Sequence, residues 1–208
     1  MFSLQTIFGK GDRFFGLLED SAAAALDATR ALLALVERKS TQPSLEEFRL
    51  ARERERRVAD AIRSELVKTF ITALEREDIE ALGNALYRIP KTVEKFAERY
   101  ALAGERIHGI DFVPRAHMLV DAAEVVGKMV HELRTMKIEP MKALSDRLRA
   151  IEVEADRLML ELYRELYAGK YDPIQTFMVH DFYEILEKAI DRCREAGVVA
   201  YQIVLKNN

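Results

Sequence analysis

Residues 172–206 read DPIQTFMVHDFYEILEKAIDRCREAGVVAYQIVLK, and this stretch decides the fold class. Asp172 followed by Pro173 is a typical helix start, because aspartate caps free backbone N–H groups and proline fits the first helical position. Apolar residues then recur at three- and four-residue spacing: Ile185, Leu186, Ala189, Ile190 and Cys193. Residues 198–205 alone would suit a strand. No turn signal precedes them, so the pattern predicts one helix over 173–206.

The same spacing continues through the rest of the chain. Five further helices are predicted between proline, glycine and capping signals: residues 12–39, 44–71, 74–103, 113–138 and 141–168. Ala59-Asp60 and the later Ala155-Asp156 indicate an internal repeat. The connecting segments are too short for anything but antiparallel neighbours. The predicted fold is therefore all-α: one domain over 1–208, built from two three-helix halves at about 1–105 and 110–208.

Composition and charge exclude several classes of protein. Of 208 residues, 49% are hydrophobic and 32% charged, which is a globular profile. The formal net charge is −3, and no basic face with interleaved aromatic residues is present, so nucleic acid is not an expected partner. An arginine-rich run over residues 49–57 alternates with Glu53 and Glu55, which predicts a solvated helix face.

Cysteine usage and hydropathy predict the compartment. Cys193 is the only cysteine, so no internal disulfide can form and the cytoplasm is the expected location. Its neighbours one helical turn away are apolar or small, which predicts a buried structural thiol. No stretch approaches the roughly 20 apolar residues needed to cross a bilayer, so a role at a membrane would require a partner.

Candidate chemistry is confined to acidic pairs. The sequence has no glycine-rich phosphate loop, no GxSxG and no HExxH, and we expect no catalytic activity. Glu152 and Asp156 are four residues apart in helix 141–168, and Glu184, Glu187 and Asp191 form a stripe on helix 173–206. Carboxylates one turn apart lie about 5–6 Å apart at Cβ and can hold one cation or bridge two. Acidic stripes are also common on solvated helices, so spacing alone leaves both interpretations open.

The order of several motifs resembles the PhoU-like family, in particular its branch of accessory proteins of Pit-type low-affinity phosphate permeases. The similarity runs along nearly the whole chain. The matching segments are Phe14-Phe15-Gly16-Leu17-Leu18-Glu19, Ala59-Asp60, Phe70-Ile71-Thr72, Arg76-Glu77-Asp78-Ile79, Ile151-Glu152-Val153-Glu154-Ala155-Asp156-Arg157, Tyr183-Glu184-Ile185-Leu186-Glu187 and Asp191-Arg192-Cys193.

This resemblance implies a PhoU-like pair of three-helix bundles, no catalysis and a regulatory role in phosphate transport. It also implies a metal site, because members of the family carry a Glu/Asp-x-x-x-Asp motif in each repeat. The second half keeps both motifs, as Glu152-x-x-x-Asp156 and Glu187-x-x-x-Asp191. The first half departs from the pattern: Arg56 precedes Asp60, and Tyr87-x-x-x-Lys91 stands where an acidic pair is expected, with Pro90 beside it.

Two functional hypotheses follow. In the first, the chain is a regulatory or accessory protein that acts through a partner such as a Pit-type phosphate permease, at the inner face of the membrane. It would bind a divalent or ferric ion (iron, zinc, manganese or similar) through Glu152, Asp156, Glu184, Glu187 and Asp191, and it could form a homo-oligomer. In the second, the chain is a metal-free structural or adaptor bundle whose acidic faces are only solvated.

Overall fold

A computed structural model describes residues 4–38, 44–107, 109–169 and 171–208, with side chains from Arg13 onward. The described residues form six α-helices and one short 3-10 helix, and they contain no strand. The helices are α1 (Leu4–Arg38), α2 (Glu46–Lys68), α3 (Arg76–Ala103), α4 (Val113–Glu132), α5 (Ile138–Tyr167) and α6 (Pro173–Lys206), with η1 (Gly104–Ile107) between α3 and α4. The predicted all-α class is confirmed.

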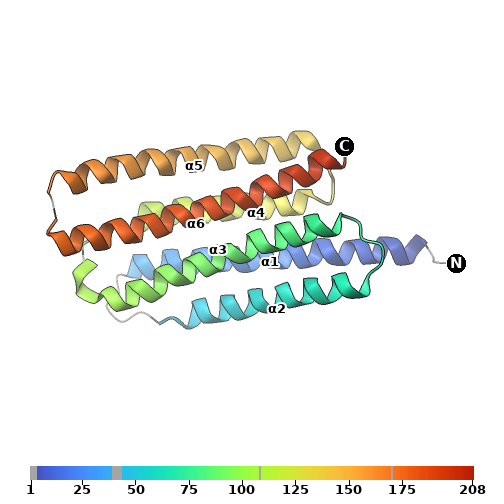
Figure 1. Ribbon diagram of the computed structural model, residues 1–208, viewed down its shortest axis with the longest axis horizontal. Helices are drawn as coiled ribbons and strands as arrows, with labels where there is room; N and C mark the ends of the chain where they lie inside the picture. Colours follow the sequence, from blue (N-terminus) through green and yellow to red (C-terminus); the bar gives the residue numbers. More distant parts are fainter. Residues whose placement is uncertain (1–3, 39–43, 108, 170) are drawn as a thin grey trace.

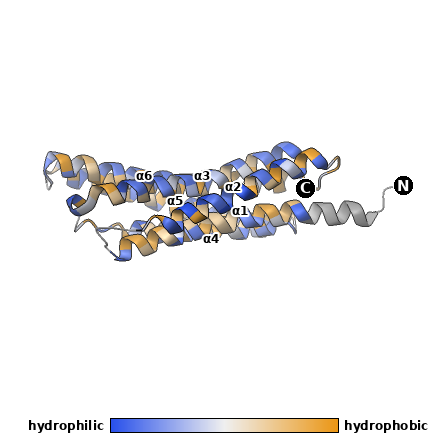
Figure 2. Cartoon of the chain, turned by 90° about the horizontal axis from the view of Figure 1, so that it is seen from below, coloured by the Kyte–Doolittle hydropathy of each residue, from blue (hydrophilic) through white to orange (hydrophobic). Residues whose placement is uncertain are grey.

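The helices are arranged as two groups of three (Figure 1). Helices α1, α2 and α3 all pack against one another, and so do α4, α5 and α6. The two groups meet where α1 packs on α4 and α3 packs on α6, so α2 and α5 lie at the outer edges. Polar and apolar residues alternate around each helix (Figure 2), which gives every helix an apolar stripe to bury against its neighbours.

A buried aromatic cluster joins the two halves. The ring centroid of Phe96 on α3 lies 5.1 Å from that of Phe182 on α6 and 5.5 Å from that of Phe112, which precedes α4. All three side chains are almost fully buried. Burying one such ring contributes about 1.5–3 kcal/mol, so this cluster is a main anchor between the halves.

The C-terminal helix forms as the sequence predicts. It spans Pro173–Lys206, and the Asp172 side chain accepts hydrogen bonds from the backbone N–H groups of Ile174 (2.9 Å) and Gln175 (3.1 Å). Cys193 is completely buried, as predicted, and burial raises the pKa of its thiol. The predicted single helix over 173–206 is therefore confirmed at both ends.

The boundaries between α4 and α5 differ from the prediction. The predicted helix over 113–138 ends at Glu132, and α5 begins at Ile138 instead of residue 141. A turn intervenes in which Met136 has a φ of 52°, in the left-handed region that non-glycine residues rarely adopt. Because no glycine marks this turn, the sequence carries no signal for it.

The start of α1 differs most from the prediction, and the remaining boundaries differ by smaller amounts. Helix α1 begins at Leu4 rather than residue 12, so glycines in this stretch do not prevent helix formation, and predicted residue 39 lies outside the described residues. Helices α2 and α3 are each shorter than predicted, by two to three residues at the connection between them. Pro90 is buried in α3, which continues on both sides of it.

The interpretation of residues 49–57 as a solvated face is wrong for Arg52, whose side chain is only 11% exposed, and for Glu55. Glu55 has no exposed surface and accepts a hydrogen bond of 2.9 Å from the Ser21 hydroxyl on α1. It shares a stripe with Ala51, Val58 and Ile62, at the three- and four-residue spacing of a buried helix face. That spacing, rather than the charge alternation, decides where Glu55 points.

No described helix has the combination of length and apolar character that crossing a bilayer requires.

Candidate functional site

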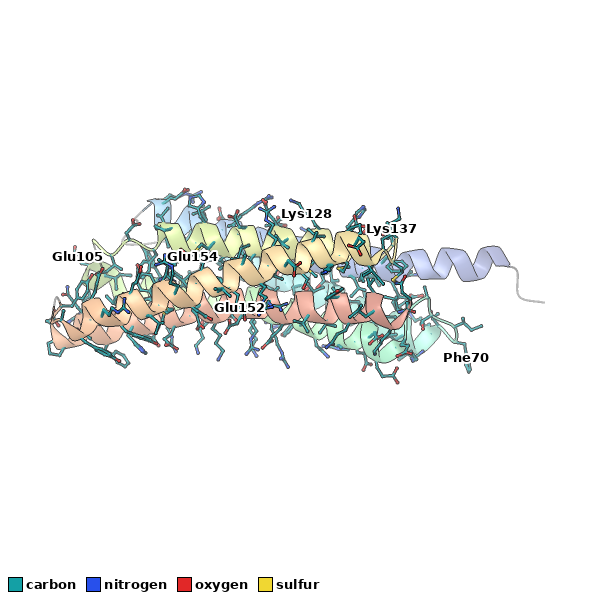
Figure 3. The ribbon with its side chains drawn as sticks, turned by 90° about the horizontal axis from the view of Figure 1, so that it is seen from above. Phe70, Glu105, Lys128, Lys137, Glu152 and Glu154 are labelled. Carbon is teal, nitrogen blue, oxygen red and sulfur yellow. The ribbon has the colours of Figure 1, made fainter. Side chains whose placement is uncertain are left out.

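The five predicted metal-ligating residues lie on two neighbouring helices. Glu152 and Asp156 project from α5, and Glu184, Glu187 and Asp191 from α6, which packs against α5. Figure 3 shows Glu152 at the side of α5 that lies next to α6. The fold therefore brings all five onto one side of the second half, and we call them the second-half acidic cluster.

Mutual repulsion within the cluster shows how close its members are. Burial, together with the charges of Asp191, Glu184 and Asp156, raises the pKa of Glu187 to about 7. Burial and the charges of Glu152 and Asp156 likewise raise the pKa of Asp191. Each of the five carboxylates thus interacts electrostatically with at least one other member of the cluster. Near neutral pH, Glu187 is therefore partly protonated.

Two members of the cluster already have partners. Glu152 accepts a hydrogen bond of 3.1 Å from the Arg194 Nε. Glu184 accepts a hydrogen bond from the Tyr163 hydroxyl, and its Oε1 lies 3.6 Å from His180 Nε2. The hydrogen bond to Glu184 raises the pKa of Tyr163 to about 12.

The other three carboxylates have no such partner. Asp156, Glu187 and Asp191 make no hydrogen bond or ion pair with any residue in the described part of the chain. Carboxylate oxygens suit hard and borderline cations such as Mn²⁺, Fe³⁺ or Zn²⁺. The donor chemistry of the cluster therefore fits a cation, and a bound cation would replace the proton on Glu187.

The present side-chain arrangement is not that of a coordination shell. Within the described ranges, no group of three or more His, Cys, Asp or Glu side chains lies close enough to hold one metal ion. The acids interact through charge over a longer range than direct ligation allows. Glu152 would have to leave Arg194, and neighbouring carboxylates would have to rotate, before they could share an ion.

Comparison with known proteins places the fold. No family model matches the chain. Among solved structures, a PhoU-like protein from Shewanella oneidensis MR-1 superposes with a TM-score of 0.79 at 15% identity, covering 93% of this chain and 99% of that one. A second structure from the same organism, described as a "putative PhoU-like phosphate regulatory protein", gives a TM-score of 0.81 at 16% identity, with the same coverage. The chain has the PhoU-like fold.

Two curated proteins are similar in sequence to this chain. "Putative pit accessory protein" of Rhizobium meliloti (strain 1021) is 25% identical, and the alignment covers 94% of both chains. "UPF0111 protein YkaA" of Bacillus subtilis (strain 168) is 27% identical over 146 residues, which are 69% of this chain and 70% of that protein. The resemblance that the ordered motifs predict is thereby confirmed.

The first half of the chain carries the opposite charge at the corresponding helix pair, α2 and α3. On α2 and α3, the Arg52 guanidinium lies over the Tyr87 ring at 4.6 Å, and its Nη2 donates to the Tyr87 hydroxyl at 3.0 Å. That hydrogen bond and the charges of Arg52, Lys91 and Arg56 lower the pKa of Tyr87. Asp60, the remaining acid of the motif, pairs with Arg63 at 2.7 Å.

Sequence reasoning missed three residues of these sites. Arg194, Tyr163 and Arg52 each contact a residue that the motifs identified, but each lies on a different helix from that residue. Such pairs have no fixed spacing along the chain, and no sequence pattern would have found them. The i,i+4 acidic pairs, in contrast, are local and were visible in the sequence.

Proposed function

We propose that this chain is a non-catalytic regulatory or accessory protein of phosphate transport that acts through protein partners, among them a Pit-type phosphate permease. In this proposal the protein is cytoplasmic and reaches the inner face of the membrane through that partner. The second-half acidic cluster binds a divalent or ferric ion and contributes to the regulation.

One observation carries the proposal. The chain is similar over 94% of its length to a protein named "Putative pit accessory protein", and it has the PhoU-like fold that the motifs predicted. An alignment of both chains over nearly their full lengths favours a shared role over a shared fragment. The family resemblance supports a regulatory rather than a catalytic role.

The electrostatics of the second half support the metal component. Glu187 and Asp191 are partly buried acids whose pKa values are raised by burial and by neighbouring carboxylates. Such an arrangement costs free energy when all members are ionised, and a multivalent cation would offset that cost. The same chemistry accommodates iron, zinc or manganese, so elemental analysis is needed to choose among them.

A metal-free adaptor is the alternative. It is favoured by the Arg194–Glu152 ion pair and by the Tyr163–Glu184 hydrogen bond, which already satisfy two of the five carboxylates. In that case the cluster keeps the surface polar, and binding of the partner depends on the shape and charge of other faces.

The partner proposal is tested in cells whose only phosphate importer is a Pit-type permease. Phosphate uptake should change when this chain is produced, and the permease should be retained on the tagged chain after extraction in mild detergent. Unchanged uptake together with no retention would reject the proposed role.

The metal proposal is tested on protein purified without chelator. Elemental analysis should find near-stoichiometric metal in the wild type, and Asp156→Asn/Glu187→Gln should lose it while remaining folded. Asp121→Asn/Asp146→Asn is the matched control, because it removes the same charge from exposed positions on α4 and α5. Equal metal contents in the wild type and both variants, or none in any of them, would favour the adaptor.

A further inference from the structure

The outer side of the α2–α3 pair carries a cluster of cations around one hydroxyl group. Arg52 and Arg56 lie one turn apart on α2, and Tyr87 and Lys91 lie one turn apart on α3. We call these four residues the first-half basic cluster. All three cationic groups lie close enough to Tyr87 to lower the pKa of its hydroxyl.

Arg52 is held rigidly within this cluster. Its side chain is only 11% exposed, its Nε donates to Glu94 at 2.9 Å, and its Nη2 donates to the Tyr87 hydroxyl at 3.0 Å. The Tyr87 oxygen therefore acts as acceptor on the inner side. Its own proton is donated to no residue in the described part of the chain, and it remains available to a ligand.

Arg56 and Lys91 supply positive charge that is not neutralised locally. Both are exposed, and within the described ranges neither makes an ion pair with a carboxylate. The acids three and four residues from Arg56 on α2 are already paired, Glu53 with Arg49 and Asp60 with Arg63, and the adjacent Glu55 is buried. Glu94 is the carboxylate that pairs with this cluster, and it pairs with Arg52. The charges of Arg56 and Lys91 therefore leave the site with an excess of positive charge.

The set of donors matches a tetrahedral oxyanion. A guanidinium group presents planar, paired N–H donors to two oxygens, a lysine ammonium adds a mobile point charge, and a phenol adds one directed O–H donor. A phosphate dianion would neutralise the two unpaired cations and accept hydrogen bonds from all three side chains. Chloride and a single carboxylate each carry one negative charge, so neither would neutralise both unpaired cations.

We propose that the first-half basic cluster binds a phosphate group through Arg56, Lys91 and the Tyr87 hydroxyl, with Arg52 as the residue that positions Tyr87. The group is either free inorganic phosphate or a phosphate monoester on a partner. This proposal goes beyond the regulatory role given above, and it does not rest on the second-half acidic cluster.

The experiment is a titration of the full chain with inorganic phosphate, phenyl phosphate, sulfate and chloride at constant ionic strength. Binding is followed by calorimetry and by the side-chain Nε–H signals of ¹⁵N-labelled arginine. Wild type should show saturable binding of phosphate and a shift of the Arg56 signal. Comparable binding of phenyl phosphate assigns the site to phosphorylated groups, and binding of inorganic phosphate alone assigns it to the free ion; either result supports the site.

Variants separate this site from general charge effects. Arg56→Gln/Lys91→Gln should weaken phosphate binding on the order of tenfold or more, because two charge-assisted hydrogen bonds are lost. Tyr87→Phe should weaken it less, since it removes one donor. The matched control is Arg57→Gln/Lys128→Gln, which removes the same charge from the groove between α1 and α2 and from α4 (Figure 3), and which should bind as wild type does.

Three results would overturn the proposal: no saturable phosphate binding, an equal response to chloride, or an equal loss in the control variant. Asp156→Asn/Glu187→Gln should retain phosphate binding. The failure of the metal proposal and the failure of this one can therefore be told apart.

Discussion

Replacing Glu55 with glutamine should remove a large part of the loss of stability that the protein suffers as pH rises from 5 to 9. Glu55 has no exposed surface, and only one of its oxygens has a hydrogen-bond partner, the Ser21 hydroxyl at 2.9 Å. Its Oε2 is buried with no partner among the described residues. Burial raises the pKa of Glu55 to about 7, although the hydrogen bond from Ser21 and the charge of Arg52 act against it.

The sign and size of the effect follow from the difference between the two states. In the unfolded chain, Glu55 loses its proton near its ordinary pKa of 4.5, whereas the folded protein retains that proton up to about pH 7. Folding therefore binds a proton between these values, and stability falls as pH rises through the window. Each pKa unit corresponds to about 1.4 kcal/mol, so a difference of roughly 2.5 units lowers the free energy of unfolding by about 3 kcal/mol at pH 9. Below pH 4.5, Glu55 is protonated in both the folded and the unfolded state, and this destabilisation is absent.

The assay is urea unfolding of wild type and Glu55→Gln at several pH values from 5 to 9. Wild type should lose about 2–3 kcal/mol more stability than the variant across this range. Only this difference in pH dependence is compared, so a constant cost of burying the glutamine amide cancels. Glu98→Gln, at an exposed position on α3, should show the pH dependence of wild type. Parallel curves for wild type and Glu55→Gln would refute the reasoning.

Three further predictions concern packing. A Cβ at Gly197 would lie 2.4 Å from Leu148 Cδ2, so Gly197→Ala should destabilise the protein by about 1–3 kcal/mol in urea unfolding. A Cβ at Gly127 would meet no atom within 4 Å, so Gly127→Ala should stabilise the protein by about 0.5–1 kcal/mol in the same assay. Cys193 is fully buried, so it should react with a thiol reagent only in unfolded protein; rapid labelling of the native state would contradict this packing. Phe96→Ala should cost about 3–5 kcal/mol in thermal or urea unfolding, and a cost below 1 kcal/mol would show that the aromatic cluster does not anchor the halves.

Local signals account for the features that were predicted correctly. The start of α6 was predictable because Asp172 and Pro173 act on backbone groups within three residues of themselves. The acidic stripes were predictable for a similar reason, since residues four apart always share a helix face. The turn around Met136 was not predictable, because tertiary packing holds an ordinary residue in a conformation usually reserved for glycine.

The first-half motif shows where local reasoning reaches its limit. Arg56 and Lys91 could be recognised as cations in place of acids from the sequence alone. Their proximity to Tyr87, and the position of Arg52 against its ring, depend on how α2 and α3 pack. A basic cluster able to bind an anion is therefore a property of the helix pair and not of either helix.

The six helices and the five carboxylates of the second half could be predicted from the amino-acid sequence alone. Both properties follow from spacing within one helix, where neighbours are fixed by the geometry of the backbone. Helix packing, in contrast, sets which carboxylates repel one another across α5 and α6, and it places Glu55 inside the protein rather than on the surface. The physical reason is that charge–charge interactions and burial depend on distances between helices, which the periodicity of a single helix does not specify.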